Sequence, residues 1–344
     1  MNSNPWRSTS VQTALEGRSF IDIKRIHIHT KHEAKEFLEC YGFNILDDAD
    51  ATELENLRLE AIELIQDELL RSNEYIPQEL IHQKDVCQYL LNASGHSNIK
   101  NALWSGALLR VIHTLAHSHS HLNDIYHDPI REQILGNFNQ HIERNKNGCF
   151  LGNIKLVEFE FRPAKSRRSV AMKLMHKAEN VAADIFDWIG IRFITEYRSD
   201  VIDVLAYLRE KHIVTYANIK PSRSRNTLID MDWLNRCLNQ GMDVDQLKKE
   251  MQTKDFPSGG VDKKSDIEHN QFSEVSYNSV QITCRQRIKI PQKNSKKLCF
   301  FFPFEIQMMD QSSFLKTREG LASHTEYKNR QRNAVRKRVL PFLK

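Results

Sequence analysis

Apolar residues recur at helical spacing through much of the first 145 residues. Over residues 50–70 they lie three or four positions apart, and Asp50 and Glu53 have the spacing of a helix capping box. The same spacing returns over residues 78–91 and 102–117, where glycine is sparse and strand-like alternation is weak. The sequence therefore predicts that this first part is mostly α-helical.

The pattern changes near residue 145, where the segment KNGCFLGN supplies turn residues. The residues that follow alternate as in a strand, with Leu156, Glu158 and Glu160 expected on one face. Together with later helical periodicity, this predicts an α+β fold with a mixed or antiparallel sheet flanked by helices. The further strands are expected at 188–195, 279–290 and 299–309, and the helices at 169–183 and 200–212.

A polar segment, residues 221–271, interrupts this pattern. It has low hydrophobicity and turn residues throughout, apart from a short helical stretch, MDWLNRCLNQ. Such a composition is typical of an inserted, partly flexible excursion. We therefore expect a helical region, residues 1–145, and a second domain, residues 146–344, that carries the insertion and a basic C-terminal helix.

The composition favours a globular protein of the cytoplasm with no membrane segment. The chain has 344 residues and a mean hydropathy of −0.55. It contains no run of about 18 apolar residues, and its first residues, MNSNPWRSTS, lack the apolar segment of a signal peptide. The six cysteines are scattered without a CxxC pair, which argues against a disulfide framework and against a thiolate zinc site.

The basic residues are distributed unevenly, although the formal net charge is only +5. The segment 328–344 contains no acid. Such a block fits two interpretations, a surface that binds the phosphates of RNA or tRNA and the solvated face of a terminal helix. Its basic residues are Lys328, Arg330, Arg332, Arg336, Lys337, Arg338 and Lys344.

Two segments of the second domain carry basic residues and an acid near an apolar strand. The first, RPAKSRRSVAMKL, starts at Arg162 and is basic where a helix is expected to begin. Arginine and lysine side chains suit phosphate oxygens because their hydrogen bonds to them are charge-assisted. The second, DWIGIRFI, starts at Asp187 and places Arg192 within a buried strand. A buried guanidinium requires a carboxylate or a phosphate, so a structural ion pair and a ligand role are both open for Arg192.

Two later segments carry an aromatic residue and a second acid. The segment SYNSVQIT places Tyr277 before an expected strand, and an aromatic face is a platform for a purine base. The segment FEIQMM contains Glu305 and Gln307, which point to the face of a strand away from their apolar neighbours. Fifteen residues after Glu305 begins GLASHTEYK, which contains His324.

In their order and spacing, these four segments resemble the motifs of RelA/SpoT-type (p)ppGpp synthetase domains over about residues 155–330. The resemblance implies a nucleotidyltransferase-like mixed sheet and a Mg²⁺-dependent transfer of pyrophosphate from ATP to a 3′-hydroxyl. The implied acceptor is GDP or GTP, which would make the product an alarmone, or else an adenine nucleotide or the 3′ end of an RNA. The alternative is a catalytically weak relative that binds nucleotide or RNA.

The resemblance also implies a role for individual residues. Asp187 and Glu305 would be catalytic and would hold Mg²⁺, with Glu305 positioning or deprotonating the acceptor hydroxyl. ATP would be bound by Arg162, Lys165, Ser169, Lys173 and Arg192, and the acceptor by Tyr277, Gln281, Gln307 and His324. The chain departs from the family pattern at Ser276, Gln281, Met309 and Thr325, where the family has glycine, histidine, arginine and tryptophan.

Histidines before residue 130 give a weaker metal signal. His113 and His117 are four residues apart, and His127 and Asp128 form an HD dipeptide like that of a metal hydrolase. This dipeptide lies too close to Arg162 for a separate hydrolase domain to fit between them. We expect exposed or capping histidines here.

Overall fold

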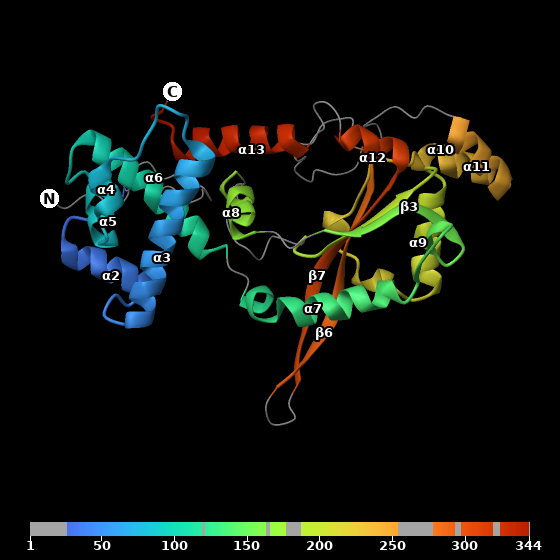
Figure 1. Cartoon of the computed structure of the whole chain (residues 1–344), viewed down its shortest axis with the longest axis horizontal. Helices are drawn as coiled ribbons and strands as arrows, with labels where there is room; N and C mark the ends of the chain where they lie inside the picture. Colours follow the sequence, from blue (N-terminus) through green and yellow to red (C-terminus); the bar gives the residue numbers. More distant parts are fainter. Residues whose placement is uncertain are drawn as a thin grey trace. The chain divides into compact units, whose positions relative to one another are not determined.

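The structure is a computed structural model that describes residues 26–118, 121–162, 166–176, 187–253, 278–292, 297–318 and 324–343. The chain forms two compact units, which we call the helical unit and the sheet unit (Figure 1). The helical unit comprises Met1–Ser120, Ser166–Asp184 and Asn329–Lys344, and the sheet unit comprises His121–Lys165 and Ile185–Lys328.

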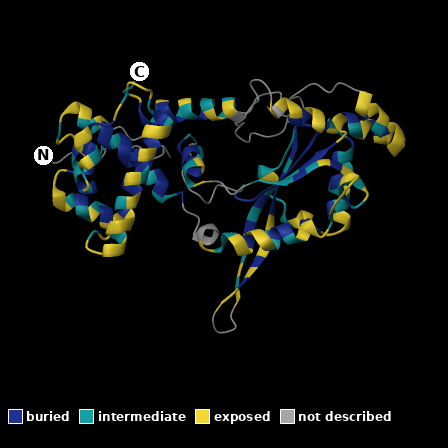
Figure 2. Cartoon of the chain, in the orientation of Figure 1, coloured by how far each residue is buried: buried dark blue, intermediate teal, exposed yellow. Residues whose placement is uncertain are grey.

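The helical unit is built around one apolar core. Figure 2 shows the buried residues gathered on the inner sides of its helices. The core contains residues far apart in sequence, such as Leu57, Leu108, Met175 and Val335, all of them 1% exposed or less. The helices are α2 (Lys31–Tyr41), α3 (Asp48–Leu64) with the π-helical turn η3 (Ile65–Leu69), α4 (Gln78–His82), α5 (Val86–Ala93), α6 (Ile99–Ala116), α8 (Arg167–Met175) and most of α13 (His324–Val339).

The two units are not consecutive halves of the chain, whereas the sequence predicts a single boundary near residue 145. α8 and the end of α13 belong to the helical unit because their apolar residues are buried in its core. α7 (His121–Asn139) belongs to the sheet unit, where Phe138 packs against Phe193 and Phe304. Burial of these apolar faces therefore decides the division, and turn residues in the sequence do not.

The expected helices are present with altered limits, although residues 177–183 of the helix expected over 169–183 lie outside the described residues. α3 begins at Asp48 because the Asp47 side chain accepts hydrogen bonds from the N–H groups of Ala49 and Asp50. The expected helix over 78–91 is divided into α4 and α5, and Asp85 caps α5 through the N–H of Cys87.

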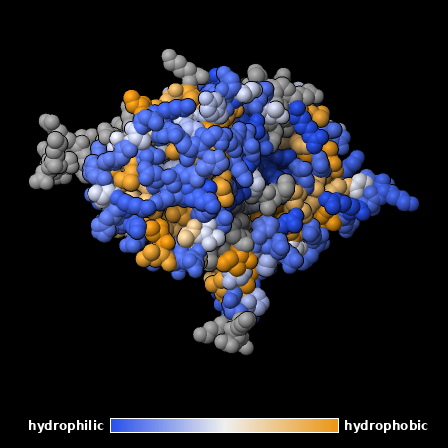
Figure 3. Space-filling model, turned by 60° about the vertical axis from the view of Figure 1, so that its left-hand side comes forward, coloured by the Kyte–Doolittle hydropathy of each residue, from blue (hydrophilic) through white to orange (hydrophobic). Residues whose placement is uncertain are grey.

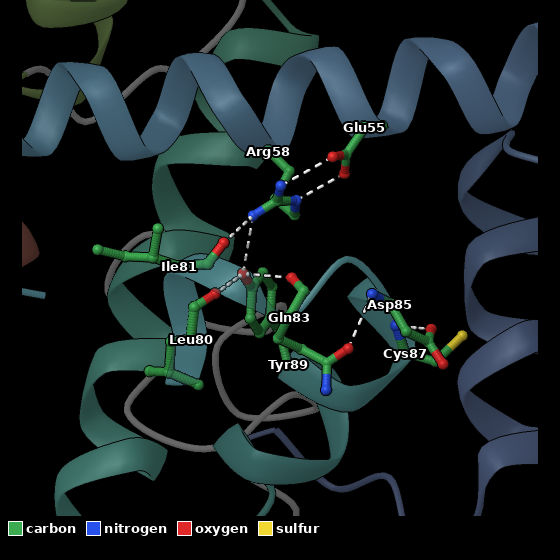
Figure 4. A network of polar contacts seen from close by, with 8 residues as sticks. All are labelled: Glu55, Arg58, Leu80, Ile81, Gln83, Asp85, Cys87 and Tyr89. Carbon is green, nitrogen blue, oxygen red and sulfur yellow. Dashed lines mark hydrogen bonds and ion pairs between the residues drawn. The ribbon is translucent and has the colours of Figure 1, made fainter. Parts of the chain in front are cut away.

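A buried arginine links three helices of the helical unit (Figure 4). Arg58 of α3 is 2% exposed, and its Nε and Nη2 donate to the Glu55 carboxylate at 2.6 and 2.8 Å. Its Nη1 donates to the Ile81 carbonyl at 2.9 Å, and the Tyr89 hydroxyl donates to the Leu80 carbonyl. The hydrogen bond from Arg58 lowers the pKa of Glu55. The buried charge of Arg58 therefore has its partners inside the fold, and these partners connect α3 to α5 and to the end of α4.

We predict that Arg58→Ala lowers the free energy of unfolding by about 3 kcal/mol, because it removes one partner of a buried ion pair and leaves the Ile81 carbonyl without its donor. Urea unfolding followed by circular dichroism measures this. Glu53→Ala, on the exposed side of α3, serves as the control and should change the value by less than ~0.5 kcal/mol. Equal losses in the two variants would contradict the role of Arg58.

The sheet unit contains one mixed sheet. Its strand order is β1-β2-β3-β4-β7-β6-β5, and among these strands β4 and β7 pair in parallel while the other pairs are antiparallel. The predicted α+β fold with a mixed sheet is therefore confirmed. The strands are β1 (Ile142–Asn145), β2 (Gly148–Leu151), β3 (Ile154–Phe161), β4 (Gly190–Thr195), β5 (Arg225–Asn226), β6 (Val280–Pro291) and β7 (Lys297–Asp310), and the helices beside α7 are α9 (Asp200–Glu210), α10 (Met231–Asn239), α11 (Val244–Thr253) and α12 (Gln311–Arg318).

The two faces of the sheet differ in chemistry. One face is aromatic, with Phe159, Phe193 and Phe304 of neighbouring strands packed around Phe138 of α7 or around one another. The other face is polar in its centre, and a small cluster of Ile194, Met309 and Phe314 closes it at one end. α7 therefore shields one face of the sheet and leaves the polar residues on the opposite face.

The expected alternation along β3 is wrong at its start. The register with β4 shifts between Leu156 and Glu158, which places Leu156 opposite Thr195 and Phe159 opposite Phe193. Leu156 therefore shares the apolar face with Phe159, and both are buried, while Val157 is 42% exposed. The irregularity is of the β-bulge kind, which sequence alternation does not reveal.

The segment expected to be an insertion over 221–271 is more regular than predicted. α10 and α11 follow β5, and each has an amphipathic pattern with buried residues on one side. Trp233 and Cys237 of α10 and Leu247 and Met251 of α11 are 4–6% exposed. The remainder of the predicted insertion, residues 254–271, lies outside the described residues.

Two further observations concern the whole described chain. Its six cysteines are free thiols. Within the described ranges, no helix combines the length and the apolar character needed to cross a membrane.

Candidate active site

The parallel pairing of β4 with β7 brings together residues that are more than a hundred positions apart in sequence. Gly190 lies opposite Glu305, and Arg192 lies opposite Gln307. Since paired residues share a face, these side chains emerge on the polar face of the sheet. Glu160 of β3 lies opposite Arg192, and Gln281 of β6 lies opposite Gln307, so one row of polar residues crosses four strands.

Arg162 joins this row by lying across Gly190. Its N–H donates to the Gly190 carbonyl at 2.9 Å, and a Cβ atom on Gly190 would be 2.9 Å from the Arg162 Cδ atom. The absence of a side chain at Gly190 therefore makes room for the arginine. The Arg162 guanidinium then reaches Glu305, with 3.3 Å between Nη1 and Oε1, and its Nη2 donates to Gln307 Oε1.

Arg192 reaches the same glutamine from the other side. Its Nε donates to Gln307 Oε1 at 3.0 Å, and its Nη1 donates to Glu160 at 2.5 Å. The acid that Arg192 requires is thus Glu160, which the sequence analysis left unassigned. The structural ion pair considered for Arg192 is present, and its guanidinium also borders the candidate site.

Gln307 has the least exposed side chain of this cluster, at 0%. Its oxygen accepts from both guanidinium groups, which fixes the orientation of the amide and points Nε2 away from them. Gln307 Nε2 and Arg162 Nε are both buried, and neither has a hydrogen-bond acceptor among the described residues. Because a buried donor without an acceptor is costly, these two groups suit a ligand with acceptor oxygens or nitrogens.

The cluster is compact and its charges are balanced. The side chains of Arg162, Arg192 and Glu305 are 27%, 22% and 17% exposed, and that of Glu160 is 31% exposed. At this depth charges interact more strongly than on an open surface. Two guanidinium groups and two carboxylates form a set in which an anionic ligand can replace a carboxylate as the arginine partner.

Asp187 stands immediately before β4, three positions ahead of Gly190, and its side chain is half-buried. The carbonyl of Ile189, two residues further on, accepts the N–H of Glu305 at 2.9 Å. The segment that carries Asp187 therefore enters the sheet beside Glu305, the residue with which Asp187 is predicted to bind Mg²⁺.

The donor set fits Mg²⁺ by its chemistry. No group of three or more His, Cys, Asp or Glu residues in the described ranges is arranged to hold a metal ion. Mg²⁺ does not require such a cage, since it is often bound by one or two carboxylates together with water and substrate phosphates. Asp187 and Glu305 are oxygen donors of that kind.

Apart from Gln281, the other predicted ligands of ATP and the acceptor belong to the helical unit or lie outside the described residues. Ser169 and Lys173 lie on α8 in the helical unit, where Ser169 donates its N–H to the capping Ser166 hydroxyl at 3.2 Å. Lys165 and Tyr277 lie outside the described residues, as does the side chain of His324 at the start of α13. Their roles stay predictions.

The basic C-terminal segment is partly used within the helical unit. Arg332 pairs with Glu68 at 2.6 Å, and Arg336 pairs with Glu74 at 2.5 Å, which lowers the pKa of Glu74. Arg338 donates to the Met175 carbonyl. These three guanidinium groups stabilise the fold, whereas Lys328 and Lys337 of the same block are exposed.

The histidines of α6 have a structural environment. His113 Nδ1 lies 2.7 Å from the Tyr41 hydroxyl, and burial lowers the pKa of His113 to about 4. His117 is the C-cap of α6, as expected for a capping histidine, whereas His113 is not exposed. His127 Nδ1 lies 3.0 Å from the carboxylate of the neighbouring Asp128.

We predict that Gly190→Ala destabilises the protein by ~1–3 kcal/mol, because the new methyl group displaces the Arg162 side chain from Glu305 and Gln307. Urea unfolding of Gly190→Ala, Arg162→Ala and the double variant measures the coupling. In the Arg162→Ala background the same change should cost less, since the 2.9 Å contact with Cδ is removed and the contact of 3.3 Å with Cβ remains. A loss of equal size in both backgrounds would show that Arg162 is not the cause.

Comparisons with known proteins give matches to solved structures alone. No protein-family model and no curated protein matches the chain. The small alarmone synthetase 2 from Bacillus subtilis matches with 14% identity over 62% of this chain and 87% of its own, at a TM-score of 0.30. A GTP pyrophosphokinase family protein from Streptococcus pneumoniae matches with 14% identity over 64% of this chain and 89% of its own, at a TM-score of 0.29. Since these overlaps are too low to carry an argument on function, we base the following proposal on the chain's own residues.

Proposed function

We propose that the protein is a Mg²⁺-dependent enzyme that transfers pyrophosphate from ATP to the 3′-hydroxyl of a nucleotide or of an RNA end. The observation that carries this proposal is the cluster of Arg162, Arg192, Glu305 and Gln307 on the polar face of the sheet. The cluster combines phosphate-binding groups, a carboxylate and buried donors without acceptors in one place. It also consists of residues from three of the four segments that resemble RelA/SpoT-type synthetase motifs.

The arginines supply the positive charge that a triphosphate needs. Arg162 holds Glu305 by one bond of 3.3 Å, which is long for an ion pair and therefore readily exchanged for a phosphate oxygen. Arg192 is held more firmly by Glu160 at 2.5 Å. We assign Arg162 to direct phosphate binding, and Arg192 to fixing Gln307 while adding charge near the phosphates. Lys165, Ser169 and Lys173 remain proposed ligands of ATP.

The reaction itself asks little covalent chemistry of the protein. The acceptor 3′-oxygen attacks the β-phosphorus of ATP, the bond from that phosphorus to the α,β-bridging oxygen breaks, and AMP leaves. Catalysis then rests on alignment and on neutralising the charge of the phosphates. Bound Mg²⁺, held by Asp187 and Glu305, would supply part of that neutralisation.

Glu305 is the candidate for positioning the acceptor hydroxyl and for taking its proton. Its side chain emerges on the polar face between Gly190 and Thr283, and it is 17% exposed. When Arg162 moves to a phosphate, the Glu305 oxygen that it holds, Oε1, can accept a hydrogen bond from the acceptor hydroxyl. Gln307 Nε2, two residues further along the same face, is a donor for an acceptor atom of the substrate.

A protein that binds nucleotide or RNA with little catalysis is the second candidate. The changes at Gln281 and Met309 favour it, because both lie beside the cluster and replace a histidine and an arginine of the family pattern. Retention of Asp187 and Glu305 favours the enzyme, since a binder needs neither acid beside phosphates.

The experiment is to incubate the protein with γ-³²P-ATP, Mg²⁺ and one acceptor at a time, and to resolve the products by thin-layer chromatography. GDP, GTP, ADP and bulk tRNA are the acceptors. We expect label in at least one acceptor with the wild type and a loss of at least a hundredfold with Glu305→Gln, the size typical for removal of a catalytic acid–base group.

Glu158→Gln is the matched control, because Glu158 lies on the same strand as Glu160 and is not part of the cluster. It should retain transfer within about twofold. ATP binding by both variants is measured by calorimetry, so that lost transfer is separated from lost folding. No transfer to any acceptor by a wild-type protein that binds ATP would overturn the enzyme and favour the binder.

A further inference from the structure

The polar face of the sheet continues beyond the candidate site along the β6–β7 hairpin. β6 and β7 remain paired from Gln281 opposite Gln307 to Pro291 opposite Lys297. Since every second pair lies on the same face, the face that carries Thr283 and Glu305 also carries the outer pairs of the hairpin. These outer pairs are Arg285–Pro303, Arg287–Phe301 and Lys289–Cys299.

This outer face is basic and contains no acid in the described strands. Arg285, Arg287 and Lys289 are all exposed, and none of their side chains forms an ion pair or hydrogen bond with another described residue. From Val280 to Gln292 and from Lys297 to Phe304 the sequence has no aspartate or glutamate. We call this surface the basic strip; it consists of Arg285, Arg287, Lys289, Lys297, Cys299 and Phe301.

The basic strip also carries an exposed aromatic ring. Phe301 is 53% exposed, whereas Phe302 and Phe304, which point to the other face, are each 3% exposed. In Figure 3 the hairpin projects from its unit with hydrophilic and hydrophobic surface side by side. Phe301 lies opposite Arg287, and an exposed aromatic ring beside basic residues suits a partner whose bases stack on it.

The opposite face of the hairpin is already occupied, which leaves the basic strip available. Gln286 is bonded to α7 through Asn137 at 3.1 Å and through the Gln133 carbonyl at 3.0 Å. Ile288 and Ile290, on the same side as Gln286, are 0% and 5% exposed. Figure 1 shows α7 crossing the base of the hairpin, from which the two strands extend.

We propose that the basic strip binds the backbone of a single-stranded RNA whose 3′ end is presented to Glu305. This inference rests on the proposed function and names its acceptor. The strip runs about 20 Å from the Glu305 pair to the Lys289 pair, at ~3.4 Å for each residue. A chain of roughly six nucleotides covers that length at a rise of ~3.4 Å for each nucleotide. A mononucleotide bound at Glu305 would therefore leave the strip empty.

The binding chemistry follows from the strip's composition. Arg285, Arg287 and Lys289 neutralise successive phosphates, and Phe301 stacks on a base without reading its sequence. Because this recognition uses backbone charge and stacking, it tolerates many sequences. The strip thereby holds the strand, while the cluster around Glu305 acts on its end.

The test uses the full-length protein and a fluorescently labelled single-stranded oligoribonucleotide, with affinity measured by anisotropy across a range of salt concentrations. The strip variant is Arg285→Gln, Arg287→Gln and Lys289→Gln together. We expect its slope of log affinity on log salt to be shallower than that of the wild type by about 2, since each phosphate contact on a single strand contributes ~0.7. Phe301→Ala should weaken binding roughly fivefold or more.

The matched control removes three exposed basic residues elsewhere in the sheet unit, Lys146→Gln, Arg236→Gln and Lys249→Gln. It should bind RNA with the wild-type slope. The proposal is overturned if the control loses as much slope as the strip variant, or if the wild type does not bind the oligonucleotide. An acidic protein or peptide that binds the strip while RNA does not would likewise replace RNA as the partner.

The same variants distinguish this inference from the proposed function. With γ-³²P-ATP, the strip variant should lose at least tenfold in transfer to an RNA 3′ end while transfer to GDP or GTP, where present, is unchanged. Equal transfer to RNA by the strip variant and the wild type would contradict the role of the basic strip in binding the RNA acceptor. If RNA binds through the basic strip but no acceptor is modified, the proposed function is wrong and the basic strip is still an RNA-binding surface.

Discussion

The candidate site depends on the parallel pairing of β4 with β7. This pairing sets Gly190 against Glu305 and Arg192 against Gln307, and it is the one parallel pair among the neighbouring strands of the described sheet. Gly190 then leaves room for Arg162, which crosses the strand to reach Glu305 and Gln307. The chemistry of the polar face therefore follows from one register and one missing side chain.

The charges on this face are stable only as a set. Glu160 pairs with Arg192 and Glu305 pairs with Arg162, so removal of any member deletes an ion pair from this half-buried face. Gln307 connects the two pairs because its oxygen accepts from both arginines. Arg162 Nε and Gln307 Nε2 remain buried without an acceptor among the described residues, and a bound substrate can supply one.

Much of this arrangement could be predicted from local sequence. The strands over 188–195, 279–290 and 299–309 have clear apolar patterns, and the spacing of Glu305 and Gln307 placed them correctly on one face. The partner of Arg192 could not be predicted, because Glu160 pairs with it only through the β3–β4 register. For the same reason the sequence did not reveal the bulge after Leu156, since a register shift has no signature in alternation.

The division into units was also beyond the reach of local patterns. α8 and the end of α13 join the helical unit through residues such as Met175 and Val335, whose burial depends on helices far away in the sequence. The helical stretch MDWLNRCLNQ was predicted and corresponds to α10, whereas α11 was missed because its apolar residues are few and lie within a polar composition. These features depend on contacts between residues far apart in the chain, and the local pattern of a single sequence does not show which distant residues meet.

The most direct test of the central claim is the fate of the adenine nucleotide. Chromatography of a reaction with ATP, Mg²⁺ and the acceptor should show AMP formed in a one-to-one ratio with an acceptor whose mass has increased by a pyrophosphate group. That result would establish cleavage between the α- and β-phosphates with transfer to the acceptor. Formation of ADP in place of AMP, or AMP with free pyrophosphate and an unchanged acceptor, would contradict the account.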